Sequence, residues 1–142
     1  MQQSSKHIFI VQNNANINSE ILNYYLCKNV SYRFICFNSA EKSIAGLYLN
    51  PDIIIMDDGL INMDTDYVFQ KIKGHKEQIH LVVLTNKGDE TYTTQLVKAG
   101  ADEYIVKRGC NEKQILSKIH MVLSNNRFSN NSLALSGSIS NA

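Results

Sequence analysis

Several features that would place a protein in a specialised class are missing from this 142-residue sequence. Its apolar runs, such as residues 52–56 and 81–84, are far too short to span a bilayer. Residues 1–7 contain no apolar core of a secretory signal. The formal net charge is only +1, so charge alone indicates neither nucleic acid nor an anionic membrane as a partner. We therefore expect one cytoplasmic domain, with no membrane contact and no direct binding of nucleic acid.

Cysteine and histidine are also too few and too scattered to form a framework. The three cysteines, Cys27, Cys36 and Cys110, make neither a metal-type pair nor a disulfide pattern. The four histidines show no ligand-like spacing. No G-x-G-x-x-G follows the first apolar run, which disfavours a dinucleotide site. Reduced thiols are consistent with the cytoplasm.

What the chain does contain is a regular alternation of apolar runs and helical patterns. We expect strands at residues 7–11, 32–37, 52–56, 79–85 and 103–106, and helices at 16–27, 38–49, 65–74, 89–100 and 111–123. This alternation predicts an α/β fold with a parallel sheet covered by helices on both faces. At this length we expect a single flavodoxin-like (βα)5 domain with strand order 2-1-3-4-5. That order places a ligand crevice at the carboxyl ends of the strands.

Local details of the helices follow from residue spacing. The first helix is expected to bury Leu22 on its apolar face, and the second to bury Tyr48. Asn38 and Glu41 form a capping-box pattern at the start of the second helix. The third helix is expected to end near Gly74.

The composition changes after Leu123. The remaining residues are rich in Ser and Asn and show no firm period. We expect the folded domain to cover residues 1–124, and residues 125–142 to form a tail or the start of a linker.

Three polar side chains stand where predicted strands end. Asp57 follows the third strand, Thr85 ends the fourth and Lys107 follows the fifth. Because neighbouring parallel strands end at the same edge, we expect these side chains to meet. A carboxylate can attack a phosphoryl group, and an ammonium and a hydroxyl suit phosphate oxygens. Each residue alone is ordinary at a strand end, but the set favours a phosphate-handling site.

Four stretches resemble the receiver domains of two-component response regulators, the CheY-like family. They are PDIIIMD at 51–57, MDT at 63–65, LTN at 84–86 and KAGADEYIVK at 98–107. The resemblance covers roughly residues 6–123. It implies that Asp57 is the phosphoacceptor, Lys107 the phosphate-binding lysine, and Thr85 and Tyr104 the switch residues.

The resemblance also implies cofactor and partners. Mg²⁺ would bind beside the phosphate, and a histidine kinase or phosphotransfer protein would supply the phosphoryl group. Phosphorylation would reshape the face made by the fourth helix, fifth strand and fifth helix, where an effector or a second copy would bind. The chain would not be an enzyme beyond its own aspartyl phosphorylation and dephosphorylation.

Two departures from the family concern the acidic site. The family normally ends its first strand with two acids that hold Mg²⁺, whereas this chain has Gln12 and Asn13. Because Mg²⁺ prefers carboxylate oxygens, we expect only a weak site made by Asp57, Asn13 and Gly59. Adjacent side chains on an extended segment point to opposite sides, so Asp58 is expected to be a solvated loop acid.

A third departure follows the fifth strand. Arg108 stands where the family has a proline after a cis bond. A non-proline cis bond costs about 2.5–4 kcal/mol, so we expect a trans bond and a rearranged loop.

Two functions from different classes stay open on these residues. The first is a receiver phosphorylated on Asp57, which the three phosphate-handling residues favour. The second is a pseudo-receiver that docks without Mg²⁺-dependent phosphorylation, which the two amides favour. A haloacid-dehalogenase-type phosphatase is disfavoured because Gly59 occupies the position of its second aspartate.

Overall fold

One parallel sheet with strand order β2-β1-β3-β4-β5 forms the centre of the computed structural model, which describes residues 6–26 and 31–127. Its strands are β1 (Lys6–Val11), β2 (Tyr32–Phe37), β3 (Ile53–Asp57), β4 (His80–Thr85) and β5 (Glu103–Val106). The helices are α1 (Ala15–Leu26), α2 (Ala40–Ala45), α3 (Thr65–His75), α4 (Glu90–Ala99) and α5 (Glu112–Arg127), with 3₁₀ turns η1 (Leu47–Leu49) and η2 (Asp58–Leu60). The predicted fold class and strand order are confirmed.

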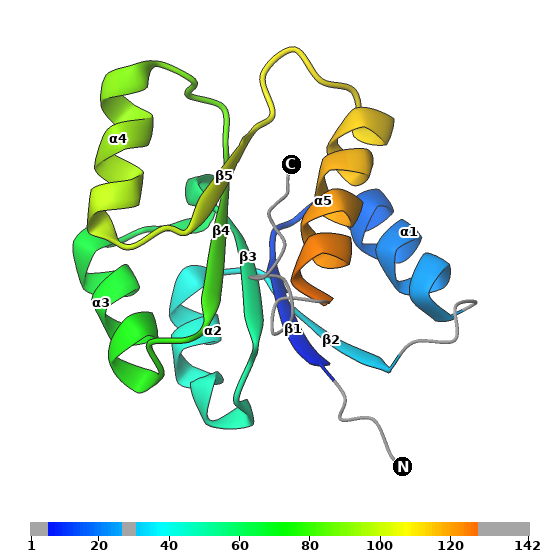
Figure 1. The fold of residues 1–142 in the computed structure, drawn as a ribbon, viewed down its shortest axis with the longest axis horizontal. Coiled ribbons are helices and arrows are strands. Elements are labelled where there is room, and N and C mark those ends of the chain that lie inside the picture. Colours follow the sequence, from blue (N-terminus) through cyan, green and yellow to red (C-terminus); the bar gives the residue numbers. More distant parts are fainter. Residues whose placement is uncertain (1–5, 27–30, 128–142) are drawn as a thin grey trace. The chain divides into compact units, whose positions relative to one another are not determined.

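The chain divides into two units, Met1–Gly109 and Cys110–Ala142. The first contains the whole sheet, with α2, α3 and α4 on one face and α1 on the other (Figure 1). The second contains α5, whose buried positions include Ile115 and Ile119, as its spacing predicts. The domain boundary expected at residue 124 stays a prediction: α5 runs to Arg127, and residues 128–142 lie outside the described part.

A buried apolar cluster joins the sheet to α2, α3 and α4. Its members from the strands are Phe9, Val11, Ile54, Met56, Leu81 and Val83, and its members from the two larger of these helices include Val68, Phe69, Ile72 and Leu96. Fully burying an aliphatic or aromatic side chain of this kind contributes about 1.5–3 kcal/mol. The cluster therefore holds the central strands in fixed register, and with them the strand ends that carry the candidate site.

Short polar side chains start the helices on this face. Ser39 caps α2 by accepting from the Lys42 N–H, and Asp64 and Asp89 cap α3 and α4 in the same way. A cap of this type contributes about 1 kcal/mol. The capping box predicted from Asn38 was wrong, because the helix begins one residue later.

Two predicted core residues are on the surface instead. Leu22 is 38% exposed and Tyr48 is 74% exposed. In α1, Leu22 is rotated about 100° from the buried Ile21, which takes it off the apolar stripe. After α2, the chain turns at Gly46 into a 3₁₀ helix, whose tighter winding interrupts the α-helical period and leaves Tyr48 outside.

The third helix ends at His75, within one residue of the end predicted near Gly74. Gly74 lies inside α3, and the helix is capped by Lys76, whose N–H donates to the carbonyl of Ile72. Nothing lies within 4 Å of the position that a Cβ of Gly74 would occupy. This glycine is therefore not required by a turn.

Candidate functional site

The carboxylate of Asp57 is held from two directions at the end of β3. Its Oδ1 accepts from the Gly59 N–H at 2.8 Å, and its Oδ2 accepts from the ammonium of Lys107. Both side chains of this ion pair are less than one-fifth exposed. A Cβ on Gly59 would lie 3.1 Å from Oδ1, so the glycine allows the η2 turn to fold closely onto the acid. The predicted proximity of Asp57 and Lys107 is confirmed.

Thr85 ends β4 and is fully buried. Its hydroxyl oxygen accepts from the Lys87 N–H at 3.0 Å. Its carbonyl accepts from the Lys107 N–H at 2.7 Å, which continues the β4–β5 pairing by one residue beyond Val106. The backbone thus positions Lys107 so that its side chain reaches back to Asp57.

The loop after Lys107 follows the trans path expected from Arg108. No cis peptide bond occurs in the described residues, and Gly109 turns the chain with a φ of 80°. Arg108 itself is exposed. Replacement of the family's proline therefore leaves the ion pair of Lys107 with Asp57 intact.

The two amides at the end of β1 have different surroundings. Gln12 is buried, and its Nε2 donates to Oδ1 of Asn18 in α1 at 2.8 Å. Asn18 in turn donates to the Gln12 carbonyl at 3.4 Å. Asn13 is exposed. The Gln12 amide is thus used to attach α1 to the strand end.

These donors fit a divalent metal poorly. Within the described part of the chain, no three His, Cys, Asp or Glu side chains are grouped so that they could hold a metal ion. The single carboxylate of the expected set, Asp57, is already paired with a cation. Mg²⁺ is usually bound by one or two carboxylates, phosphate oxygens and waters. Asn13 and Gly59 would add only neutral oxygens to Asp57.

Asp58 is not the solvated loop acid that its position suggested. It is half-buried, and its Oδ2 accepts from the hydroxyl of Tyr92 at 2.5 Å. Burial and the Asp58 carboxylate raise the pKa of Tyr92 to about 12, while the Thr85 side chain lowers it in part. The phenol is therefore neutral at physiological pH and acts as a donor to Asp58.

Tyr92 and Lys87 are residues of the site region that the sequence did not indicate. Lys87 places its ammonium 5.0 Å from the centre of the Tyr92 ring. Neither residue lies in the four stretches that resemble the family, and Asp58 and Tyr92 are 34 positions apart. Tyr104, the predicted aromatic switch residue, lies on β5 and is 43% exposed.

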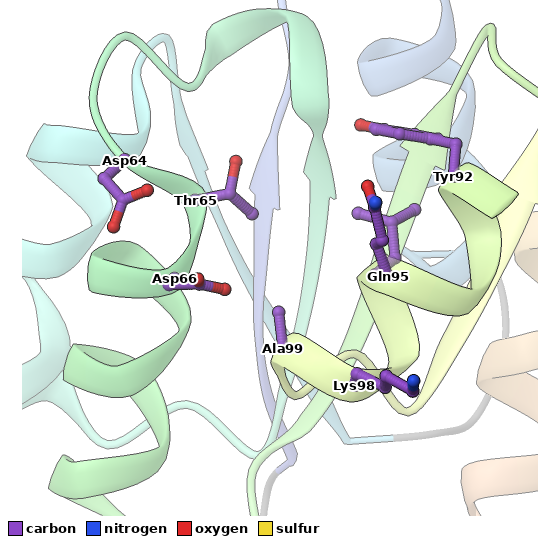
Figure 2. A pocket seen from close by; sticks show the side chains of 8 residues that line it. Asp64, Thr65, Asp66, Tyr92, Gln95, Lys98 and Ala99 are labelled. Atoms are coloured by element: carbon purple, nitrogen blue, oxygen red, sulfur yellow. The ribbon is translucent and has the colours of Figure 1, made fainter.

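A cavity of about 530 Å³ lies beside this region, between α3 and α4 (Figure 2). Its lining consists of Asp64, Thr65, Asp66, Tyr92, Gln95, Leu96, Lys98 and Ala99. Asp57 and Lys107 are not part of the lining. Tyr92 is the residue that belongs both to this cavity and to the neighbourhood of Asp58.

Comparison with known proteins gives a consistent result. A family model described as the response regulator receiver domain matches residues 8–120. The transcriptional regulatory protein ResD of Bacillus subtilis is 32% identical over 107 residues, which cover 75% of this chain and 43% of ResD. The chain thus spans less than half the length of this curated relative.

Solved structures show the same fold. The phosphorylated cyanobacterial phytochrome response regulator RcpA superposes with a TM-score of 0.69 at 24% identity, covering 88% of this chain and 94% of RcpA. The Mn²⁺-bound form of the response regulator Rcp1 also has a TM-score of 0.69, at 19% identity, covering 84% of this chain and 92% of Rcp1. In the described residues, no helix has the length and apolar character needed to cross a membrane.

Proposed function

Because the chain belongs to the response regulator receiver domain family of two-component signalling, we propose that it is a signalling module phosphorylated on Asp57. The phosphoryl donor is a partner histidine kinase or phosphotransfer protein. The observation that carries this proposal is the ion pair between Asp57 and Lys107 at the carboxyl ends of β3 and β5. It supports the proposal because a carboxylate that can act as a nucleophile lies beside a cation that can bind phosphate.

The proposed chemistry needs few groups. A carboxylate oxygen of Asp57 attacks the phosphorus of a phosphohistidine, an O–P bond forms, and the N–P bond breaks with its electron pair going to the imidazole. The ammonium of Lys107 then balances part of the charge on the phosphate. The hydroxyl of Thr85 supplies a hydrogen bond to a phosphate oxygen. No catalysis beyond this phosphorylation and its reversal is proposed.

None of these steps is assigned to Mg²⁺, because the donor set described above fits the ion poorly. We expect the ion to bind weakly through Asp57, Asn13 and Gly59, and phosphorylation to be slow. The Mn²⁺ in the structure of Rcp1 is a property of that protein. In this chain the fixed positive charge beside the acid comes from Lys107.

The partner surface is proposed to include α4 and β5. Val97 of α4 is 50% exposed and Tyr104 of β5 is 43% exposed. An effector or a second copy of the chain would bind there. That α5 also contributes to this partner surface stays a prediction. ResD is a transcriptional regulator of which this chain matches less than half, so an output domain that acts on transcription is part of the proposal.

A second candidate function is a docking module that works without phosphorylation. One observation favours it: the Gln12 side chain is buried and bonded to Asn18 where a metal-binding receiver would present an acid. In such a module the α4–β5 surface would have one state.

Phosphorylation with acetyl phosphate, read by mass spectrometry of the intact protein, distinguishes the two candidates. We expect one phosphoryl group on the wild type and on Asp66→Asn, a matched exposed acid, but none on Asp57→Asn. BeF₃⁻ with excess Mg²⁺ should shift the amide resonances of Thr85 in the wild type. Absence of both responses would overturn the phosphorylation proposal and favour the docking module.

A further inference from the structure

The contact between Asp58 and Tyr92 connects α4 to the residue that follows the proposed phosphoacceptor. The phenol donates to Oδ2 of Asp58 at 2.5 Å across 34 positions of sequence. Both side chains are half-buried. A hydrogen bond to a charged group at such a site is stronger than one between neutral groups. We call this contact the Asp58–Tyr92 bridge.

The surroundings of Tyr92 hold the bridge in one geometry. The N–H of Tyr92 donates to the helix-capping carboxylate of Asp89 at 3.1 Å, which fixes the first turn of α4. The ammonium of Lys87 lies over the ring. The Lys87 N–H donates to the hydroxyl oxygen of Thr85 at the end of β4. The segment between β4 and α4 is therefore held by hydrogen bonds at both of its ends.

Thr85 takes part in both sites. Its hydroxyl oxygen accepts from the N–H of Lys87, whose ammonium lies 5.0 Å from the centre of the Tyr92 ring, and it is also the hydroxyl proposed to bind phosphate. A phosphoryl group on Asp57 would add about 1.5 to 2 negative charges at the position before Asp58. It would also attract the Thr85 hydroxyl toward its oxygens. Movement of Thr85 displaces Lys87 and thereby removes one support of the Tyr92 ring.

We propose that the Asp58–Tyr92 bridge keeps the start of α4 attached to the loop after β3, and that phosphorylation of Asp57 releases it. Tyr92 is then a positioning residue that reports the state of Asp57 to α4. Because Tyr92 also lines the α3–α4 cavity, its release changes the wall of that cavity (Figure 2). The release step rests on the proposed function, whereas the bridge itself does not.

Tyr92→Phe removes the hydroxyl and keeps the ring. Without any phosphate analogue, we expect hydrogen exchange at the amides of Ile61 and Thr93 to be about tenfold faster than in the wild type, which corresponds to about 1.4 kcal/mol. Asp58→Asn should also speed exchange. In the double variant, the free-energy change calculated from the exchange rates should be smaller than the sum of the changes in the two single variants. Tyr67→Phe, at an exposed tyrosine of α3, should leave both rates within about twofold. Equal exchange in Tyr92→Phe and wild type would overturn the bridge.

BeF₃⁻ tests the release step. In the wild type, the Thr93 amide resonance should move toward its position in unliganded Tyr92→Phe, and in that variant BeF₃⁻ should move Thr85 but leave Thr93 nearly unchanged. A wild-type response at Thr85 with no movement at Thr93 would overturn the release step. If the wild type shows no response anywhere, the proposed function fails together with the release step, while the exchange rates still decide whether the bridge exists.

Discussion

Asp57 and Asp58 are neighbours in sequence with separate partners. Asp57 is bonded to Lys107 and Gly59, whereas Asp58 is bonded to Tyr92. The chain passes from β3 into the η2 turn between them, and within the described residues the two carboxylates have no partner in common. Each like charge therefore has its own compensation, which lowers the cost of placing two acids together.

The Gln12 and Asn13 amides lead to a prediction about metal affinity. Gln12→Asp combined with Asn13→Asp supplies two carboxylates at the end of β1, next to β3. We expect Mg²⁺ affinity, measured by calorimetry, to rise well over tenfold, which is more than about 1.4 kcal/mol. Asn38→Asp adds one acid after β2, at the sheet edge, and should leave the affinity unchanged. Equal affinities in the wild type and the double variant would contradict the expected role of the missing acids.

A second prediction concerns the alkaline range. The pKa of Tyr92 is raised to about 12 in the folded chain, while an unfolded tyrosine titrates near about 10. Between these values the unfolded chain loses the proton and the folded chain keeps it, so stability falls as pH rises. Urea unfolding at about pH 9 and about pH 11 should therefore show a steeper loss in the wild type than in Tyr92→Phe. A pH-independent difference between the two proteins would argue against this environment for the phenol.

At the scale of the elements, the backbone needs a glycine at the end of α4 but not within α3. Gly100 follows α4 with a φ of 130°, in the region that residues with a side chain rarely adopt. Gly74 is inside α3, is exposed, and has open space around its Cα. Only the first glycine is needed for the chain path.

The prediction is a pair of substitutions with opposite signs. Gly100→Ala should lower the free energy of unfolding by about 1–3 kcal/mol because of backbone strain. Gly74→Ala should raise it by about 0.5–1 kcal/mol, since alanine favours the helix interior. Both are measured by urea unfolding. A stabilised Gly100→Ala would show that the turn after α4 can relax without a positive φ.

At the scale of the whole molecule, the parallel sheet gathers the proposed site. β3 lies between β1 and β4, and its residues are paired on both sides. The strands run in the same direction, so Asp57 and Thr85 end up at one edge, with Lys107 directly after β5. The arrangement of the site therefore depends on the buried centre of the sheet.

This dependence is tested in the core. Ile54 is fully buried in the apolar cluster, and Ile54→Ala should cost about 2–5 kcal/mol of unfolding free energy through lost burial and a cavity. Val97→Ala, on the exposed face of α4, should change it by less than about 0.5 kcal/mol. Urea unfolding followed by circular dichroism measures both. A similar small effect of the two substitutions would contradict the assigned core.

Sequence alone was sufficient for the fold and for most of the strand-end residues. Alternating apolar runs and helical periods are local signals, so the α/β class followed from them, and β2 and β5 have the predicted bounds. The strand order 2-1-3-4-5, expected for such a chain of this length, is also confirmed. The pairing of Asp57 with Lys107 also followed, because topology brings the ends of parallel strands together. The roles of these residues, and of Thr85 and Tyr104, stay predictions.

The hydrogen-bond partners of Asp58 and Gln12 were determined by the tertiary structure alone. Nothing local to Asp58 indicates Tyr92, because their contact depends on how α4 lies against the loop after β3. The bond from Gln12 to Asn18 likewise depends on the angle at which α1 leaves the sheet. Side-chain periods predict which face of an element is apolar, but they do not contain the distances between elements. Those distances result from packing of the core, and they make Asp58, expected to be solvated, the acceptor for a half-buried phenol.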